Sequence, residues 1–237
     1  MKKALLATAI AALTISNAWA VDGAHTDLTV KGKLLVGGCT PVINGGAVLD
    51  FGSHLVSGLS ATAVNEIGTK TTNLVITCPS ATKVGWTLTD NKSGTTADIW
   101  VANSAYGAGS TYGVGKTAGG VNIGAYSVAI DATAAESAQA TNGNDSFDVS
   151  FIYGAAATAD VGGEVGWRDT KNVASFKNQN DAQDLVTIAA KGTIIPIAYT
   201  SATYPLTISL AVDTTTKLAI TDDTDIDGST TITLKYI

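Results

Sequence analysis

Short runs of alternating apolar and polar residues recur through the chain, and this pattern restricts its fold more than any other feature. Clusters of Gly, Asn, Asp or Ser bound the runs, as expected for turns, and almost no segment has the period of an amphipathic helix. The runs are Leu28–Lys31, Asn73–Cys78, Val84–Thr89, Ile99–Val101, Ala125–Ile130, Phe147–Tyr153, Leu185–Ala190, Gly192–Tyr199, Leu206–Val212 and Thr230–Ile237. Many short strands joined by polar turns predict an all-β chain that folds as a sandwich or barrel in one domain.

Two stretches lack strong strand character. Residues Gly107–Gly120 are rich in Gly, and residues Ala132–Asp145 are rich in Ala, Thr and Asn. We expect both to form long surface loops, with a short helix around Ala134–Ala138 as the alternative in the second.

The first 20 residues have the three parts of a secretory signal peptide. Lys2 and Lys3 precede the apolar stretch Ala4–Ile15, and Ala18 and Ala20 provide the small residues of a cleavage site. The apolar stretch is shorter than the roughly 20 residues that a membrane-spanning helix requires. We therefore expect cleavage after Ala20, export beyond the inner membrane of a Gram-negative-type cell, and no membrane span after cleavage.

The charge of the remaining 217 residues argues against two classes of partner. Loss of Lys2 and Lys3 leaves 12 basic and 20 acidic residues, a net charge near −8. Because nucleic acids and anionic lipids bind basic surfaces, neither is an expected partner.

Export also bears on the two cysteines, Cys39 and Cys78. An oxidising compartment favours a disulfide bond between them, which would close a long loop. The alternatives are two buried thiols or a metal site. His25 and His54 do not stand at a metal-ligand spacing from either cysteine, which makes the metal site the weaker alternative.

Motifs for catalysis or for a cofactor are weak. Gly113–Thr117 resembles the end of a phosphate-binding loop, but Ser110 stands where that loop needs its first Gly. No Ser lies in a G-x-S-x-G turn, and neither His lies in a recognisable catalytic context. We expect no catalytic residue and no cofactor, and an extracellular hydrolase is the least favoured function.

One acidic turn resembles half of a calcium site. Asp223, Asp225 and Asp227 alternate before Gly228, as in the first half of an EF-hand loop, but Leu234 stands where a bidentate Glu is needed. We expect no metal there, and interpret the turn as one that keeps a sheet edge soluble.

The last strand has two distinct faces. One face carries Thr230, Ile232, Leu234 and Tyr236, and the other carries Thr231, Thr233 and Lys235. Such a strand can pair through its backbone with a partner while alternate side chains fill pockets. It can equally be the last strand of a plain sandwich, and alternation alone does not distinguish the two.

Several landmarks occur in order along the chain. The predicted signal peptide is followed by a short polar leader, a first strand at Leu28–Val36, two cysteines about forty residues apart and a penultimate Tyr. Further landmarks are Gly38–Val42, Gly45–Gly52, Asn73–Cys78, Tyr112–Gly115, Asn122–Ala125 and Asp227–Gly228. Together they resemble subunits of chaperone–usher fimbriae, and more specifically the GltF-like, beta-fimbrial family, whose domain is one of unknown function.

The resemblance implies a single immunoglobulin-like, pilin-like β-sandwich that lacks its last strand, with residues 21–29 as a leader and residues 30–237 as the domain. In such subunits a periplasmic chaperone lends a strand, and the N-terminal extension of the next subunit later replaces it. The chaperone would contact the strand of Thr230, Ile232, Leu234 and Tyr236, and the donor-strand candidate residues are Ala24, Thr26 and Leu28. Two features differ from the usual pattern: the leader offers mainly Leu28 as a bulky apolar residue, and Thr224 replaces a usual Gly.

We therefore expect a non-enzymatic fimbrial or fimbria-like subunit that passes from the periplasm to the fimbrium at the cell surface. Its partners would be a periplasmic chaperone and neighbouring fimbrial subunits. The alternative is a soluble periplasmic binding or regulatory protein that uses the same sandwich without polymerising.

Overall fold

Most of the alternating runs are strands of an antiparallel β-sandwich in the computed structural model, which describes residues 29–30, 38–104, 110–156, 166–170, 176 and 183–237. The strands are β1 (Thr40–Ile43), β2 (Asn65–Thr82), β3 (Val84–Asp90), β4 (Tyr112–Gly113), β5 (Gly124–Ile130), β6 (Gln139–Asn142), β7 (Asp145–Ala155), β8 (Trp167–Asp169), β9 (Asp184–Ala190), β10 (Tyr199–Val212) and β11 (Thr230–Tyr236). The short helices are α1 (Ala132–Ala135), α2 (Thr215–Leu218) and the 3-10 turns η1 (Val56–Gly58) and η2 (Ser93–Thr95). The predicted all-β sandwich is confirmed.

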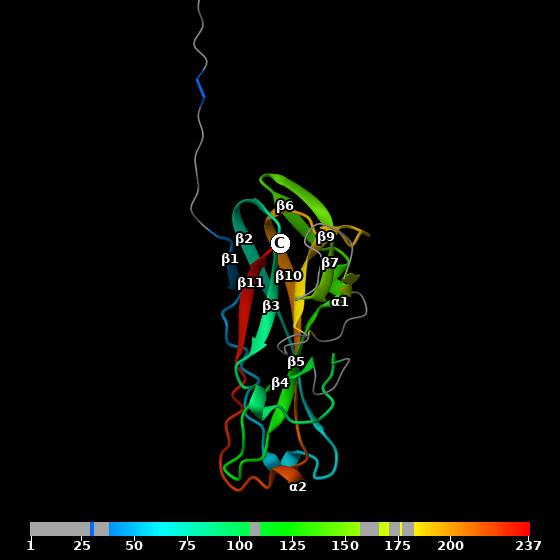
Figure 1. The fold of residues 1–237 in the computed structure, drawn as a ribbon. Coiled ribbons are helices and arrows are strands. Elements are labelled where there is room, and N and C mark those ends of the chain that lie inside the picture. The colour runs from blue at the N-terminus through cyan, green and yellow to red at the C-terminus, as the bar shows by residue number, and fades with distance from the viewer. Residues whose placement is uncertain (1–28, 31–37, 105–109, 157–165, 171–175, 177–182) are drawn as a thin grey trace, which may run out of the picture. The chain divides into compact units, whose positions relative to one another are not determined.

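The strands form two layers that face each other across the core (Figure 1). One layer has the order β1–β2–β10–β5–β4, and the other has the order β11–β3–β9–β7–β8. β6 connects the layers, because it pairs with β10 on one side and with the first residues of β7 on the other. Among the described strands, the hydrogen-bonded path therefore begins at β1 and ends at β11.

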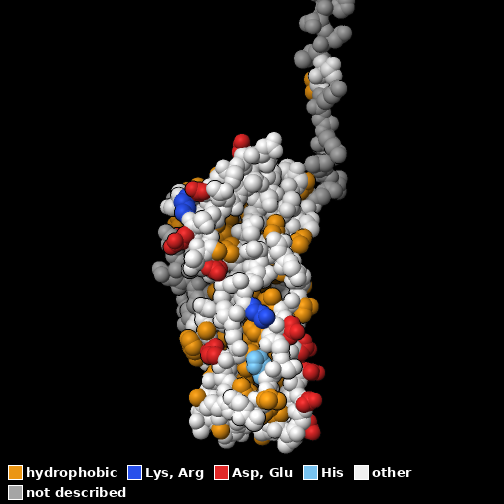
Figure 2. All heavy atoms as spheres, turned by 180° about the vertical axis from the view of Figure 1, so that it is seen from behind, with side chains coloured by type: hydrophobic (Ala, Val, Ile, Leu, Met, Phe, Trp, Pro, Cys, Tyr) orange, Lys and Arg blue, Asp and Glu red, His pale blue; other side chains and the backbone are white. Residues whose placement is uncertain are grey.

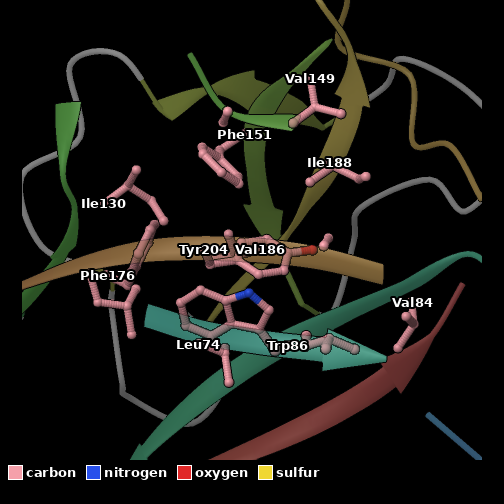
Figure 3. Packing of buried hydrophobic residues seen from close by; sticks show 14 of the residues in the cluster. Leu74, Val84, Trp86, Ile130, Val149, Phe151, Phe176, Val186, Ile188 and Tyr204 are labelled. Carbon is pink, nitrogen blue, oxygen red and sulfur yellow. The ribbon is translucent and has the colours of Figure 1, made fainter. Parts of the chain in front are cut away.

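Side chains from both layers meet around Trp86 of β3. The Trp86 ring meets the rings of Phe176 and Tyr204 edge to face, at centroid distances of 5.4 and 5.6 Å (Figure 3). Leu74 of β2 and Val186 of β9 belong to the same buried cluster. Because each large apolar side chain contributes roughly 1.5–3 kcal/mol by leaving water, this cluster supplies much of the stability that holds the layers together.

Two of the predicted strands are wrong. Ile99–Val101 joins no ladder with a described strand. Ile99 and Val101 pack with Ala125 of β5 and Ala211 of β10, whereas Trp100 is 61 % exposed. The alternation arises because one side of this segment is buried, although the segment does not pair with a described strand. Gly192–Tyr199 forms a single bridge, between Ala189 and Pro196, before β10 begins. Proline has no N–H to donate to a ladder, which accounts for the interruption.

The two predicted surface loops are more closely packed than expected. The described part of Gly107–Gly120 contains β4, whose residue Tyr112 is fully buried. Gly113 is required there, because a Cβ at that position would overlap the Lys92 carbonyl. Ala132–Asp145 contains α1, which begins two residues before the predicted helix, and β6. The high content of small residues therefore reflects close approach of backbone segments as well as turns.

The predicted signal peptide, residues 1–20, lies outside the described residues, as do the leader residues Ala24, Thr26 and Leu28. In the part of the chain that the structure describes, no helix is both long and apolar enough to cross a membrane.

The predicted disulfide bond between Cys39 and Cys78 is confirmed, and the two Cα atoms are 4.1 Å apart. Cys39 immediately precedes β1, and Thr40 pairs with Thr77, so the bond continues the β1–β2 pairing by one residue. Cys78 is buried in the main core. The bond therefore fixes the four-residue strand β1 to β2.

Replacing both Cys39 and Cys78 by alanine should destabilise the fold by about 4 kcal/mol, because the unfolded chain would regain the entropy that closing this loop removes. Urea unfolding followed by tryptophan fluorescence measures the change. Reduced wild-type protein is the control and should match the double variant. An unfolding midpoint that does not move in either sample would contradict the prediction.

Candidate functional site

The candidate site is an open apolar cleft beside β11. β11 pairs with β3, in register from Thr230 opposite Asp90 to Tyr236 opposite Val84. β1 pairs with β2 at the other end of the path. Neither strand has a described strand on its other edge, so the backbone groups along those edges belong to no described ladder.

The cleft has a volume of about 1110 Å³, and we call it the β11 cleft. Its floor includes Tyr126 and Val128 of β5 and residues of β10 from Leu206 to Val212, which is about 20 Å of strand. One wall is the segment Ala47–Val56 with Leu59, and the other is Asp222–Gly228 continuing into β11. Most pockets for small molecules have volumes of about 300–1,000 Å³. The volume of this cleft is close to that range, but its length along seven residues of β10 suits a strand of polypeptide.

The C-terminal strand contributes its predicted face to this site only in part. Thr230, Ile232 and Leu234 are half-buried, whereas Thr231, Thr233 and Lys235 are exposed. Ile232 lines the cleft, and Leu234 packs against the main core. A role of this strand in binding a chaperone or subunit stays a prediction.

Tyr236 lies apart from the cleft lining and is 57 % exposed. Its hydroxyl accepts a hydrogen bond of 2.8 Å from the backbone N–H of Cys39. This contact joins the end of β11 to the residue before β1, beside the disulfide bond. The two edges of the sandwich are therefore connected at this end, although they form no ladder.

Sequence reasoning missed the wall Ala47–Val56. Leu49 and Phe51 are half-buried against the main core, and Lys70 lies over the Phe51 ring at 5.7 Å from its centroid. Val48 and Leu55 are 83 % and 81 % exposed. The alternation of Leu49, Asp50 and Phe51 was a signal that this segment lies on an apolar surface. No strand was predicted there because the alternation covers only these three residues, and the segment belongs to no described strand.

Tyr126 links the floor of the cleft to the start of β11. Its hydroxyl forms a short hydrogen bond with the Thr230 hydroxyl, and its ring stacks on Tyr112 at a centroid distance of 5.1 Å. A Cβ at Gly228 would overlap the Tyr126 ring, which explains the glycine before the last strand.

Burial raises the pKa of four tyrosines, Tyr112, Tyr126, Tyr199 and Tyr204, above the usual value. For Tyr112, desolvation is the largest cause and the neighbouring Tyr126, Asp184 and Asp90 add to it. The folded state therefore keeps these phenols neutral at pH values where tyrosines of the unfolded chain ionise, at about pH 10.

This difference predicts a loss of stability at alkaline pH. The four tyrosines contribute fully to the free energy of unfolding below about pH 10. This contribution is lost as the pH rises above that value, because the unfolded state then releases protons that the folded state retains. Urea midpoints measured between pH 8 and pH 11 should fall above pH 10. Tyrosinate absorbance recorded in parallel should show these four tyrosines ionising only as the chain unfolds. Full ionisation of all seven tyrosines in a chain that is still folded would contradict this.

The acidic residues considered for calcium, Asp223, Asp225 and Asp227, are exposed and line the cleft. Asp227 forms an ion pair of 2.7 Å with Lys92. Among the described residues, no group of three or more His, Cys, Asp or Glu side chains is placed to hold a metal ion.

Comparison with known proteins identifies the family of this chain. The family described as "Protein of unknown function (DUF1120)" matches residues 28–127, which include both cysteines and the wall Ala47–Val56. Protein GltF of Escherichia coli (strain K12) is 31 % identical in an alignment that covers 100 % of this chain and 99 % of that protein. The chain belongs to this GltF-like family. The uncharacterized protein YhcF of the same organism is 29 % identical, with 100 % of both chains covered. The predicted family is thus confirmed, and its relation to fimbrial subunits stays a prediction.

Proposed function

We propose that this protein is an exported, non-enzymatic fimbrial or fimbria-like subunit that is assembled by pairing with a strand of another protein. The observation that carries the proposal is the break in the described sandwich, where the edge of β11 borders an apolar cleft. The partners would be a periplasmic chaperone and then a neighbouring subunit. The function would be structural, in a fimbrium at the cell surface.

The backbone of β11 supports this proposal. An edge strand presents N–H and C=O groups that an added strand can pair with, and main-chain hydrogen bonds then provide affinity. Along its seven-residue length, β11 pairs with no described strand except β3. The register of an added strand would be set by side chains, because a slip of one residue reverses its two faces.

The side chains that border this edge support it as well. Ile232 of β11 lines the cleft together with the apolar floor of β5 and β10. An added strand could therefore bury every second side chain against apolar surface. Each such burial is worth roughly 1.5–3 kcal/mol.

Export is supported by the features of residues 1–20 and by the disulfide bond, which is typical of proteins outside the cytoplasm.

One observation favours the alternative, a soluble periplasmic protein that does not polymerise. The floor residues Leu206, Ile208 and Leu210 are only 3–7 % exposed, and Leu49 and Phe51 of the wall pack against the core clusters that contain them. A chain that covers its own apolar surface needs a partner less. An entering strand would have to lie between this wall and β11, or displace the wall.

Ile232→Asp should reduce chaperone binding at least tenfold, whereas Thr233→Asp should change it less than twofold. The two neighbours introduce the same charge on opposite faces of β11, and only Ile232 lines the cleft. A loss of 1.5–3 kcal/mol of burial corresponds to at least a tenfold change in affinity. The measurement is co-purification of each variant with a tagged periplasmic chaperone from an exporting cell.

Urea unfolding of both oxidised variants is the control for folding, and binding is compared only after it. Equal retention of the two variants would contradict the proposal. A wild-type protein that stays monomeric and soluble without any chaperone would support the periplasmic alternative.

A further inference from the structure

We propose that the strand that enters the β11 cleft carries Lys or Arg where it passes the loop Asp222–Asp227. The inference rests on the proposed strand pairing and adds the chemistry of the partner: an extended polypeptide segment, apolar at alternate positions and basic at one end.

Carboxylates lie on both walls of the cleft, and four of the five are on one wall. Asp50 lies on one wall, and the other wall carries Asp222, Asp223, Asp225 and Asp227. The described lining includes no Lys or Arg. Figure 2, which shows the molecule from behind, has acidic side chains in a row along one border and hydrophobic side chains in patches beside them.

Nearby cations compensate this charge only in part. Lys92 pairs with Asp227 at 2.7 Å. Lys116 lines a separate hollow together with Asp222, Asp223 and Asp225, but forms no ion pair with them among the described residues. Lys70 lies over the Phe51 ring of the other wall, so three ammonium groups face five carboxylates around the loop and the wall. A basic segment would restore the balance of charge, and an acidic segment would increase the repulsion.

The two walls of the cleft also offer apolar contacts. Ile226 lies within the acidic loop, and Val48 and Leu55 are largely exposed on the opposite wall. Lys and Arg bury the aliphatic part of the side chain along apolar surface while the charged group reaches a polar partner. The combination of apolar and acidic lining therefore fits a basic side chain better than a purely apolar or a purely polar one.

The end of the cleft toward β1 does not share this charge, because its lining there includes Ile43 and Thr72 and no carboxylate. Beyond the lining at that end, the Tyr236 hydroxyl accepts a hydrogen bond from the Cys39 N–H. The cleft therefore has two chemically different ends, so the position of the basic residues would also determine the direction in which a strand binds.

Synthetic peptides test the proposal with the exported, oxidised chain. The peptides have nine alternating Val and Thr residues, blocked termini, and a pair of Lys, Ser or Asp at either the amino or the carboxyl end. Fluorescence anisotropy at about 20 mM salt should show one Lys-ended peptide binding about tenfold more tightly than the Asp-ended peptide of the same orientation. The difference should fall below twofold at about 500 mM salt, where screening is strong.

Two triple variants separate the loop from the overall charge. Asp222→Asn, Asp223→Asn and Asp225→Asn together should remove the preference for Lys. The matched control removes three exposed carboxylates that do not line the cleft, through Asp98→Asn, Asp145→Asn and Asp148→Asn, and should keep the preference.

Failure of this inference can be distinguished from failure of the proposed function. If the Ser-, Lys- and Asp-ended peptides bind equally and Ile232→Asp abolishes binding of all of them, the strand pairing stands and the basic partner is wrong. A Lys preference that survives in the loop variant would also overturn the inference. If no peptide binds at either salt concentration, the inference and the strand pairing both fail.

Discussion

The ladder of backbone hydrogen bonds begins at β1 and ends at β11, and these two strands do not pair with each other among the described residues. Several other features follow from this constraint. The disulfide bond fixes the short strand β1 to β2, and the Tyr236–Cys39 hydrogen bond joins the two edges at one end. Away from that end, the edges stay separate and the β11 cleft lies along β11. An unpaired edge beside apolar surface is the physical basis for proposing a strand as the partner.

The wall Ala47–Val56 determines how strongly such a partner would be needed. Leu49 and Phe51 contact the core and cover part of the floor, while Val48 and Leu55 on the same wall are exposed to solvent. The lone chain thus has less exposed apolar surface than an empty groove would give it, yet the edge of β11 has no described partner. A covered floor favours a sandwich that is stable by itself, whereas an unpaired β11 edge favours a subunit that polymerises.

The position of the acidic loop in the structure indicates more about its role than its composition does. Read as a sequence, Asp223, Asp225 and Asp227 suggested half of a calcium site or a solubilising turn. In the structure, they belong to one wall of an apolar cleft, and Asp227 pairs with Lys92 from the segment after β3. Under the proposed strand pairing, charge in that position would favour a basic strand and set its direction. Membership of the GltF-like family provides relatives in which the same positions can be compared.

The sequence by itself determined the all-β class, the disulfide bond and the alternating faces of β11, because period-two alternation and cysteine pairing are legible without knowledge of neighbours. It could not determine pairing partners. Ile99–Val101 alternates like a strand but packs on the outside of β5 and β10, and the Gly-rich region around Tyr112 is buried. The candidate site was predicted only as a strand, whereas its floor, its wall and its acidic end come from segments far apart in the chain. Only the tertiary structure decided them, since alternation records which side chains are buried and not which backbone lies beside them.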